Sequence, residues 1–180
     1  MDEIKWENNR FTLAGGPKSL KITPKQSGAV VIPKIQDKFL LEKIKRTDGQ
    51  YHLEFPRGFQ DNERLIDTAK RELFEETHLK ANQMIDLGPA MADSGLINGS
   101  ANIYLAKIDD MHQQIKLQES ENIVDSVMVF LPEMLDMVSL NKIIDGYSLA
   151  AIAKYLASNG LNIDRKISEN VRMINNLADL

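Results

Sequence analysis

Three glutamates in the stretch RELFEETHL (71–79) have the type and spacing of a metal-binding cluster. Glu72, Glu75 and Glu76 recur at three and four residues, so a helix would place them as neighbours on one side. Carboxylate oxygens in this number suit a hard divalent cation such as Mg²⁺, which keeps several water ligands. An acidic helix face that only meets solvent is the competing interpretation, and these three residues alone do not separate the two.

The residues around this cluster favour the metal interpretation. The stretch GFQDNERLIDTAKRELFEETHL (58–79) resembles the Nudix box, whose family pattern is G-x5-E-x7-R-E-U-x-E-E-x-G-U, with U an aliphatic residue. A match that combines charged and apolar positions at fixed spacing is specific. The matching positions are Glu63, Arg71, Glu72, Leu73, Glu75, Glu76 and Leu79.

The resemblance implies roles for these residues. In Nudix hydrolases the loop–helix–loop binds Mg²⁺ or Mn²⁺ and cleaves a diphosphate that links a nucleoside to a second group. By that resemblance the ion would be held by Glu72, Glu75 and Glu76, with the backbone of Gly58 beside it. Two further residues of the box, Glu63 and Arg71, would pair with each other and orient the helix.

Catalytic and substrate contacts are also expected outside the metal ligands. Glu76 would help to position the attacking water, and the candidate bases are Glu119 and Glu121, which precede a predicted strand. Arg57 would bind a substrate phosphate through its guanidinium group, although a surface arginine in a turn is an equal alternative. Trp6 is the candidate for stacking on the base, or else it packs at an interface.

The sequence departs from the family pattern in three places. Four residues separate Gly58 from Glu63, where the family has five, so the loop before the helix is one residue short. His78 occupies the position of the family's glycine, which we expect to be a left-handed helix end. Ser94 lies where members specific for ADP-ribose usually carry a proline, which weakens the assignment of the substrate but not that of the reaction.

The chain must form a helix to position the box. Ile66, Ala69, Leu73 and Thr77 recur at helical spacing and predict a buried stripe on a helix over about 62–77, with the three glutamates pointing away from the core. Short apolar or alternating stretches predict strands, and two later stretches predict helices. The strands are expected at about 27–34, 38–46, 51–56, 81–91, 100–108 and 121–131, and the helices at 132–137 and 145–157.

This order predicts an α/β fold: a Nudix-type α/β/α sandwich with a mixed central sheet. We expect three parts: an N-terminal β element over 1–26 with two strand-like stretches, a hydrolase domain over 27–157, and a C-terminal helical extension over 158–180. In the ADP-ribose pyrophosphatase branch, which the helix at 141–157 also resembles, the N-terminal element contributes to a homodimer and to the adenine pocket.

Composition excludes several classes. The 180 residues carry a formal net charge of −4, which argues against binding to nucleic acid or to an anionic membrane. Without cysteine the chain has no disulfide and no thiol chemistry. No signal peptide or membrane-spanning run is visible, so we expect a cytoplasmic protein.

The leading interpretation is a metal-dependent hydrolase that converts ADP-ribose to AMP and ribose 5-phosphate. NADH, diadenosine polyphosphates and nucleotide sugars remain alternative small-molecule substrates. A Nudix-fold module that senses such a nucleotide without cleaving it is the alternative from another class.

Overall fold

The structure is a computed structural model, and it describes residues 3–118 and 122–159. Ten strands and three helices follow one another in the described residues. They are β1 (Glu3–Glu7), β2 (Phe11–Gly16), β3 (Ser19–Pro24), β4 (Gly28–Ile35), β5 (Lys38–Lys45), β6 (Tyr51–Glu54), β7 (Arg57–Phe59), α1 (Leu65–Thr77), β8 (Gln83–Ala90), β9 (Ala101–Ile108), β10 (Ile123–Phe130), α2 (Leu131–Ser139) and α3 (Gly146–Ser158).

The central sheet has seven strands in the order β10-β5-β4-β9-β8, with β6 paired to β5 and β7 paired to β4. Strands β4 and β9 run parallel, whereas the other pairs in this sheet are antiparallel, so the sheet is mixed. Because β7 and β9 both pair with β4, the segment before α1 is fixed to the middle of the sheet.

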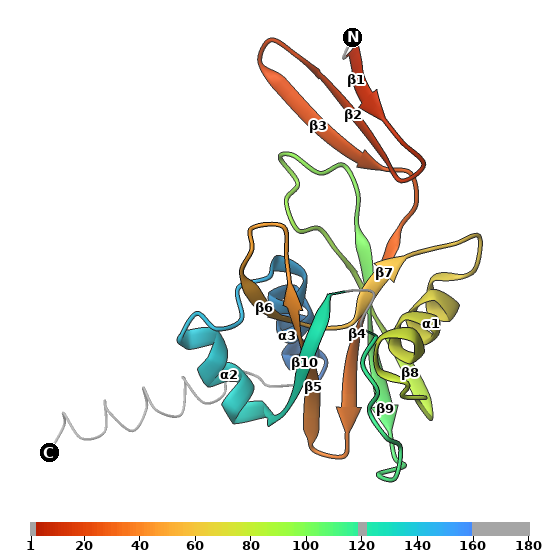
Figure 1. The fold of residues 1–180 in the computed structure, drawn as a ribbon, viewed down its shortest axis with the longest axis vertical. Helices are drawn as coiled ribbons and strands as arrows, with labels where there is room; N and C mark the ends of the chain where they lie inside the picture. Colours follow the sequence, from red (N-terminus) through yellow and green to blue (C-terminus); the bar gives the residue numbers. More distant parts are fainter. Residues whose placement is uncertain (1–2, 119–121, 160–180) are drawn as a thin grey trace, which may run out of the picture.

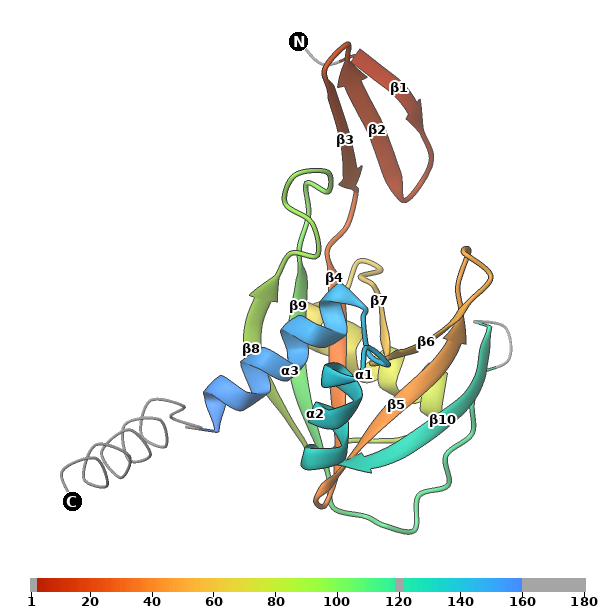
Figure 2. The same ribbon diagram turned by 90° about the vertical axis from the view of Figure 1, so that its left-hand side faces the viewer.

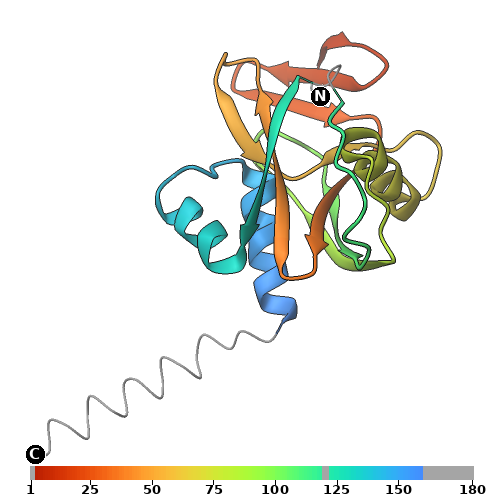
Figure 3. The same cartoon turned by 60° about the horizontal axis from the view of Figure 1, so that its bottom comes forward.

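Side chains on β4 alternate between the two faces of this sheet, as a strand with a period of two requires. Ala29 and Val31 pack with Ala69 and Leu73 of α1 on one face. Val30 and Ile32 pack on the other face, in a core that also contains residues of α2 and α3. The sheet therefore lies between α1 on one side and α2 with α3 on the other (Figures 1, 2 and 3). The predicted α/β/α sandwich is confirmed.

The N-terminal strands form a second, three-stranded sheet in the order β1-β2-β3, which projects beyond the central sheet (Figure 1). Two stretches were predicted here, and the structure adds β1 at the edge. Beyond the covalent link, β3 contacts the loop between β8 and β9. The backbone N–H of Ile22 donates to Leu96 O (2.8 Å), and that of Asn98 donates to Ile22 O (2.8 Å).

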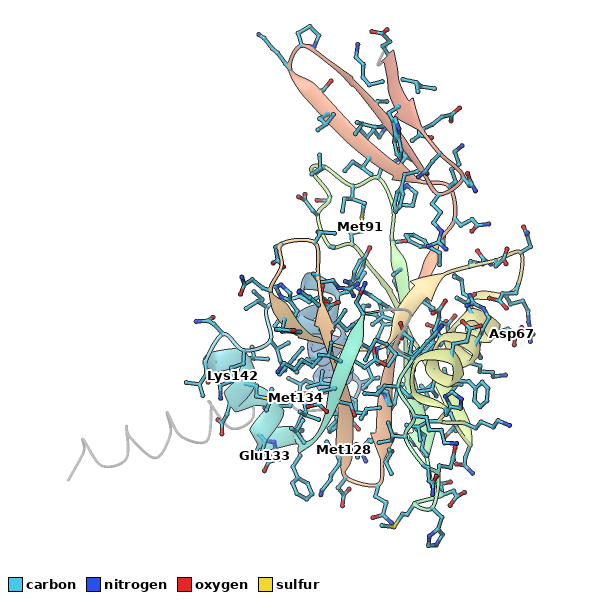
Figure 4. The ribbon with its side chains drawn as sticks, in the orientation of Figure 1. Asp67, Met91, Met128, Glu133, Met134 and Lys142 are labelled. Carbon is cyan, nitrogen blue, oxygen red and sulfur yellow. The ribbon has the colours of Figure 1, made fainter. Side chains whose placement is uncertain are left out.

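Most predicted elements are present, with different ends. Helix α1 begins at Leu65 rather than near Asn62, because residues 62–64 belong to the preceding loop. The strand predicted over 51–56 ends at Glu54, and Arg57–Phe59 form a further short strand, β7. Helix α2 begins at Leu131 and buries Met134 against the sheet, whereas Glu133 lies on its outer side (Figure 4).

The expected boundary after residue 26 falls between β3, which ends at Pro24, and β4, which begins at Gly28. The expected boundary after residue 157 instead falls one residue before the end of α3 at Ser158. The predicted C-terminal extension lies, apart from its first two residues, outside the described residues. Among the helices that the structure describes, none is long and apolar enough to cross a membrane.

Candidate active site

A cavity of about 820 Å³ opens beside the predicted box, between its first residues and the glutamates of α1. Its wall combines α1, β7, the start of β4 and the N-terminal sheet. Carboxylates come from α1, and guanidinium groups come from the strands and turns around it. The lining residues that matter below are Arg46, Arg57, Gly58, Arg71, Glu72 and Glu76.

Two of the predicted metal ligands, Glu72 and Glu76, are buried, with exposed fractions of 8% and 5%. They lie one turn apart on the side of α1 that packs against β7. A Cβ atom on Gly58 would lie 2.0 Å from Glu72 Oε1, so only glycine leaves room for this carboxylate. Glu76 Oε2 accepts a hydrogen bond from the backbone N–H of Arg57 at 3.0 Å. The expectation that the three glutamates point outward, away from the core, is therefore wrong for Glu72 and Glu76, because both are buried against β7, whereas Glu75 is exposed.

Arg71 holds the acidic residues of the box together. Its Nε donates to Glu63 Oε1 at 3.0 Å, which is the pair that the box predicts. Its Nη1 lies 2.7 Å from Glu72 Oε1 and 2.8 Å from Glu75 Oε2, and its Nη2 donates to the carbonyl of Phe59 at 2.9 Å. Burial opposes the charge on Arg71, yet the hydrogen bonds that Arg71 donates to Glu63 and Glu75, together with the negative charge of Glu72, raise its pKa above the ordinary value.

The loop that is one residue short still joins β7 to α1 with these contacts in place. The side-chain amide of Gln60 donates to the carbonyl of Glu63 across the loop. Asn62 takes up a left-handed conformation with φ 55°. Asparagine is among the residues that adopt this region most readily, so the tight turn is compatible with the sequence. The shortened loop therefore still places Gly58 and Glu63 against residues of α1.

His78 ends the helix in the left-handed conformation predicted for the family's glycine, with φ 61° and ψ 13°. Its backbone N–H donates to Phe74 O at 2.8 Å, and its ring packs beside the Phe74 ring with centroids 5.2 Å apart. Nδ1 of His78 lies 3.1 Å from the carbonyl oxygen of Lys116. Glycine would adopt the left-handed conformation freely, whereas His78 adopts it with the support of the contacts that its ring makes.

The donor set fits a divalent ion in its chemistry. Carboxylate oxygens are the ligands that Mg²⁺ and Mn²⁺ prefer, and one cationic nitrogen of Arg71 already lies between Glu72 and Glu75. Within the described residues, however, no three acidic or histidine side chains lie close enough together to hold an ion. Binding of an ion by the predicted set therefore requires Glu72 or Glu75 to leave Arg71.

The other predicted site residues fall in different places. Arg57 lines the cavity, and its guanidinium group makes ion pairs with Glu54 and Asp145. Trp6 lies on β1, is 52% exposed, and is not part of the cavity wall. The two candidate bases, Glu119 and Glu121, lie outside the described residues.

Sequence analysis missed part of the cavity wall. Arg46, at the end of β5, lines the cavity and binds Glu54 through two hydrogen bonds. Asp145 caps α3, since its side chain accepts from the backbone N–H of Ser148 at 2.8 Å. An acidic residue before a helical stretch is a recognisable capping signal. No local pattern marks Arg46 and Glu54, because their pairing depends on the β5–β6 hairpin.

Comparisons with known proteins identify a solved structure with a similar fold. No family model matches the chain, and no curated protein matches its sequence. A solved structure, the crystal structure of an ADP compounds hydrolase, is similar with a TM-score of 0.69 and 18% sequence identity. The match covers 89% of this chain and 94% of that chain. At this identity the likeness shows a shared fold, in agreement with the predicted α/β/α sandwich with a mixed sheet.

Proposed function

We propose that the chain hydrolyses the diphosphate of a nucleoside diphosphate derivative with Mg²⁺ or Mn²⁺ bound, and that ADP-ribose, giving AMP and ribose 5-phosphate, is its substrate. One observation carries this proposal. The box carboxylates Glu72 and Glu76 line a cavity that also contains arginine side chains, so groups suited to a cation and to a phosphate share one space. The structural likeness to an ADP compounds hydrolase supports the same class of substrate.

The residues of this chain divide the chemistry among them. Glu72, Glu75 and Glu76 would hold the ion, which when bound would neutralise phosphate oxygens and lower the pKa of a water molecule. Glu76, fixed by the N–H of Arg57, would orient the attacking water. Water adds to one phosphorus, the P–O bond of the anhydride breaks, and a carboxylate accepts the proton. Glu119 and Glu121 remain the proposed bases.

The substrate within this class is less narrowly defined. At the position of the missing proline, Asp93 Oδ1 instead accepts hydrogen bonds from the backbone N–H groups of Gly95 (2.8 Å) and Leu96 (3.2 Å). This turn lies in the loop that contacts β3 through Ile22. NADH, diadenosine polyphosphates and nucleotide sugars therefore belong in the same assay. We also propose that the chain forms a homodimer. Trp6 does not line the cavity of its own chain, so it would contact a substrate only in the cavity of a second copy of the chain.

A nucleotide-sensing module without hydrolysis is the second candidate. The observation that favours it is the position of Arg71, whose Nη1 contacts both Glu72 and Glu75. If those contacts persist when a nucleotide binds, the metal ligands stay engaged and no hydrolysis follows.

The test is turnover of the purified protein with Mg²⁺ on this substrate panel, with products identified by mass spectrometry. We expect one compound to be cleaved, with complete loss in EDTA. Glu76→Gln should lower kcat by roughly 100-fold or more, as removal of a preorganised charged group at a reaction centre does. Asp37→Asn, a carboxylate-to-amide change at an exposed turn, is the matched control and should keep full activity.

Binding of Mn²⁺, followed by electron paramagnetic resonance, separates the two candidates. The hydrolase should bind Mn²⁺ more weakly after Glu76→Gln. Nucleotide binding without cleavage of any compound, together with Mn²⁺ affinity that Glu76→Gln leaves unchanged, would favour the sensing module.

A further inference from the structure

One buried carboxylate in the cavity wall, Glu54, holds two arginines. Nε and Nη2 of Arg46 donate to its two oxygens at 2.9 and 2.6 Å. Nη2 of Arg57 lies 2.7 Å from Glu54 Oε2. The Glu54 side chain is 3% exposed, whereas Arg46 and Arg57 are 37% and 25% exposed. The carboxylate is therefore inside the protein, and both guanidinium groups reach the cavity.

The contacts fix how each guanidinium group is turned. Arg46 commits Nε and Nη2 to Glu54, which leaves Nη1 without a partner among the described residues. Arg57 commits Nη2 to Glu54 and Nη1 to Asp145, at 3.1 Å. A guanidinium group has five N–H donors, so these pairs leave donors on both arginines for a ligand. The hydrogen bonding of Arg46 to the Glu54 carboxylate, which accepts, is the main cause that raises the pKa of Arg46, so the guanidinium group stays charged.

The pair formed by Glu54 and Arg57 is connected to a second element of the fold, the start of helix α3. Asp145 accepts hydrogen bonds from both the backbone N–H and the Oγ of Ser148, and Ser148 Oγ in turn accepts from the N–H of Phe55, beside Glu54. The Tyr147 ring lies under Arg57, with its centroid 5.4 Å from the guanidinium carbon. Strand β6 and helix α3 therefore position Arg57 together.

We propose that Glu54 is a positioning residue that sets Arg46 and Arg57 as a pair to bind a phosphate group of the substrate; this inference rests on the proposed function. Arginine forks bind phosphate through two parallel hydrogen bonds, which requires a fixed orientation. The carboxylates of α1 lie in the same cavity. The ion would therefore bind at α1, and a phosphate group of the diphosphate would bind at the two arginines. A neutral residue at 54 keeps both positive charges but loses their alignment.

The experiment measures binding of inorganic pyrophosphate with Mg²⁺ by calorimetry, which requires no turnover. Glu54→Gln should weaken pyrophosphate binding about tenfold, and for any compound that is cleaved it should raise KM more than it lowers kcat. Arg46→Lys should have a similar effect. The double variant should be no worse than either single one, because coupled residues are not additive. Glu133→Gln, on the outer side of α2 (Figure 4), is the matched control and should bind normally.

Unchanged pyrophosphate binding in Glu54→Gln, or losses that multiply in the double variant, would overturn the role of Glu54. If Glu54→Gln does not fold, two other variants test the same role: Glu54→Asp keeps the charge, and Arg46→Lys alters a more exposed group. Normal pyrophosphate binding in Arg46→Lys would equally overturn the proposed phosphate clamp, which consists of Arg46 and Arg57 held by Glu54. Pyrophosphate binding that depends on Glu54, in a protein that cleaves nothing, would support the clamp and reject the hydrolase. Absence of pyrophosphate binding by the native chain would reject the clamp.

Discussion

Two charge clusters in the cavity wall are built in opposite ways. Around Arg71, one cation is surrounded by three carboxylates, those of Glu63, Glu72 and Glu75. Around Glu54, one carboxylate is surrounded by two cations. The first cluster therefore has an excess of negative charge and the second has an excess of positive charge before Asp145 is counted.

The two clusters would suit the two oppositely charged parts of the proposed ligand. A metal ion paired with a diphosphate presents a cation and an anion at once, and each needs a partner of opposite sign. The two clusters also differ in origin. The Arg71 cluster comes from one loop and one helix, whereas the Glu54 cluster joins β5, β6, β7 and the start of α3. Variants can test each cluster separately.

The largest effect among these variants is expected at Gly58. Gly58→Ala places a methyl group 2.0 to 2.4 Å from the carboxylate of Glu72, which must move. Displacement of a catalytic group by about 1 Å costs on the order of 100-fold in rate, so kcat should fall by that factor, whereas overpacking should destabilise the fold by only about 1 to 2 kcal/mol. Steady-state kinetics and urea unfolding measure the two.

Gly16→Ala is the control for this variant, because the nearest atom to its new Cβ would be Ser19 Oγ at 3.6 Å, an ordinary contact. Normal turnover in Gly58→Ala would mean that the negative cluster is not where the reaction occurs.

Arg71→Lys tests whether the negative cluster depends on the arginine fork. Lysine keeps the charge but cannot reach Glu63, Glu72 and Glu75 at once. Because hydrogen bonds to charged groups contribute about 1.5 to 3 kcal/mol each, we expect a loss of about 2 kcal/mol in the free energy of unfolding, and a loss of activity of roughly tenfold.

Arg64→Lys, at the N-cap of the same helix, is the matched control. Its side chain is 77% exposed and pairs with Asp67 on the outer side of α1 (Figure 4), so we expect a change within about 0.5 kcal/mol. Equal losses in the two variants would show that Arg71 is an ordinary surface cation.

The smallest effect is expected at His78. His78→Gly removes the cost of a left-handed conformation, about 1 kcal/mol, but also the ring contacts, so the free energy of unfolding should rise by about 0.5 kcal/mol. His78→Ala keeps the strain and loses the ring, so it should destabilise. Thermal unfolding and turnover measure the result. A change of turnover in either variant would show that the carboxylates respond to the end of the helix.

Sequence patterns predicted the features of the structure that depend on neighbouring residues. In the predicted stripe, Ala69, Leu73 and Thr77 are buried and Ile66 is partly buried against the core, and the pair between Glu63 and Arg71 is present. The left-handed conformation of His78 follows from its place in the box. Likewise, the layers follow from the alternation of helical and strand-like stretches. Each of these features depends on residues within one element or its immediate neighbours.

What depends on pairing between distant segments could not be predicted. Periodicity placed Glu72 and Glu76 on the outer side of their helix, but β7 covers them, because residues 57–59 pair with β4. The contact between Arg57 and Asp145 joins residues that lie far apart along the chain. The roles of Trp6, Glu119 and Glu121 stay predictions.

The N-terminal sheet has a consequence for how the protein can change over generations. Asn9, Arg10, Phe11 and Pro24 contribute to the cavity wall, whereas Glu72 and Glu76 belong to α1. Under the proposed function, substitutions around β1–β3 would change which substrates the cavity admits without replacing a proposed metal ligand. Substrate selectivity and catalysis would then evolve in different stretches of the chain and at different rates.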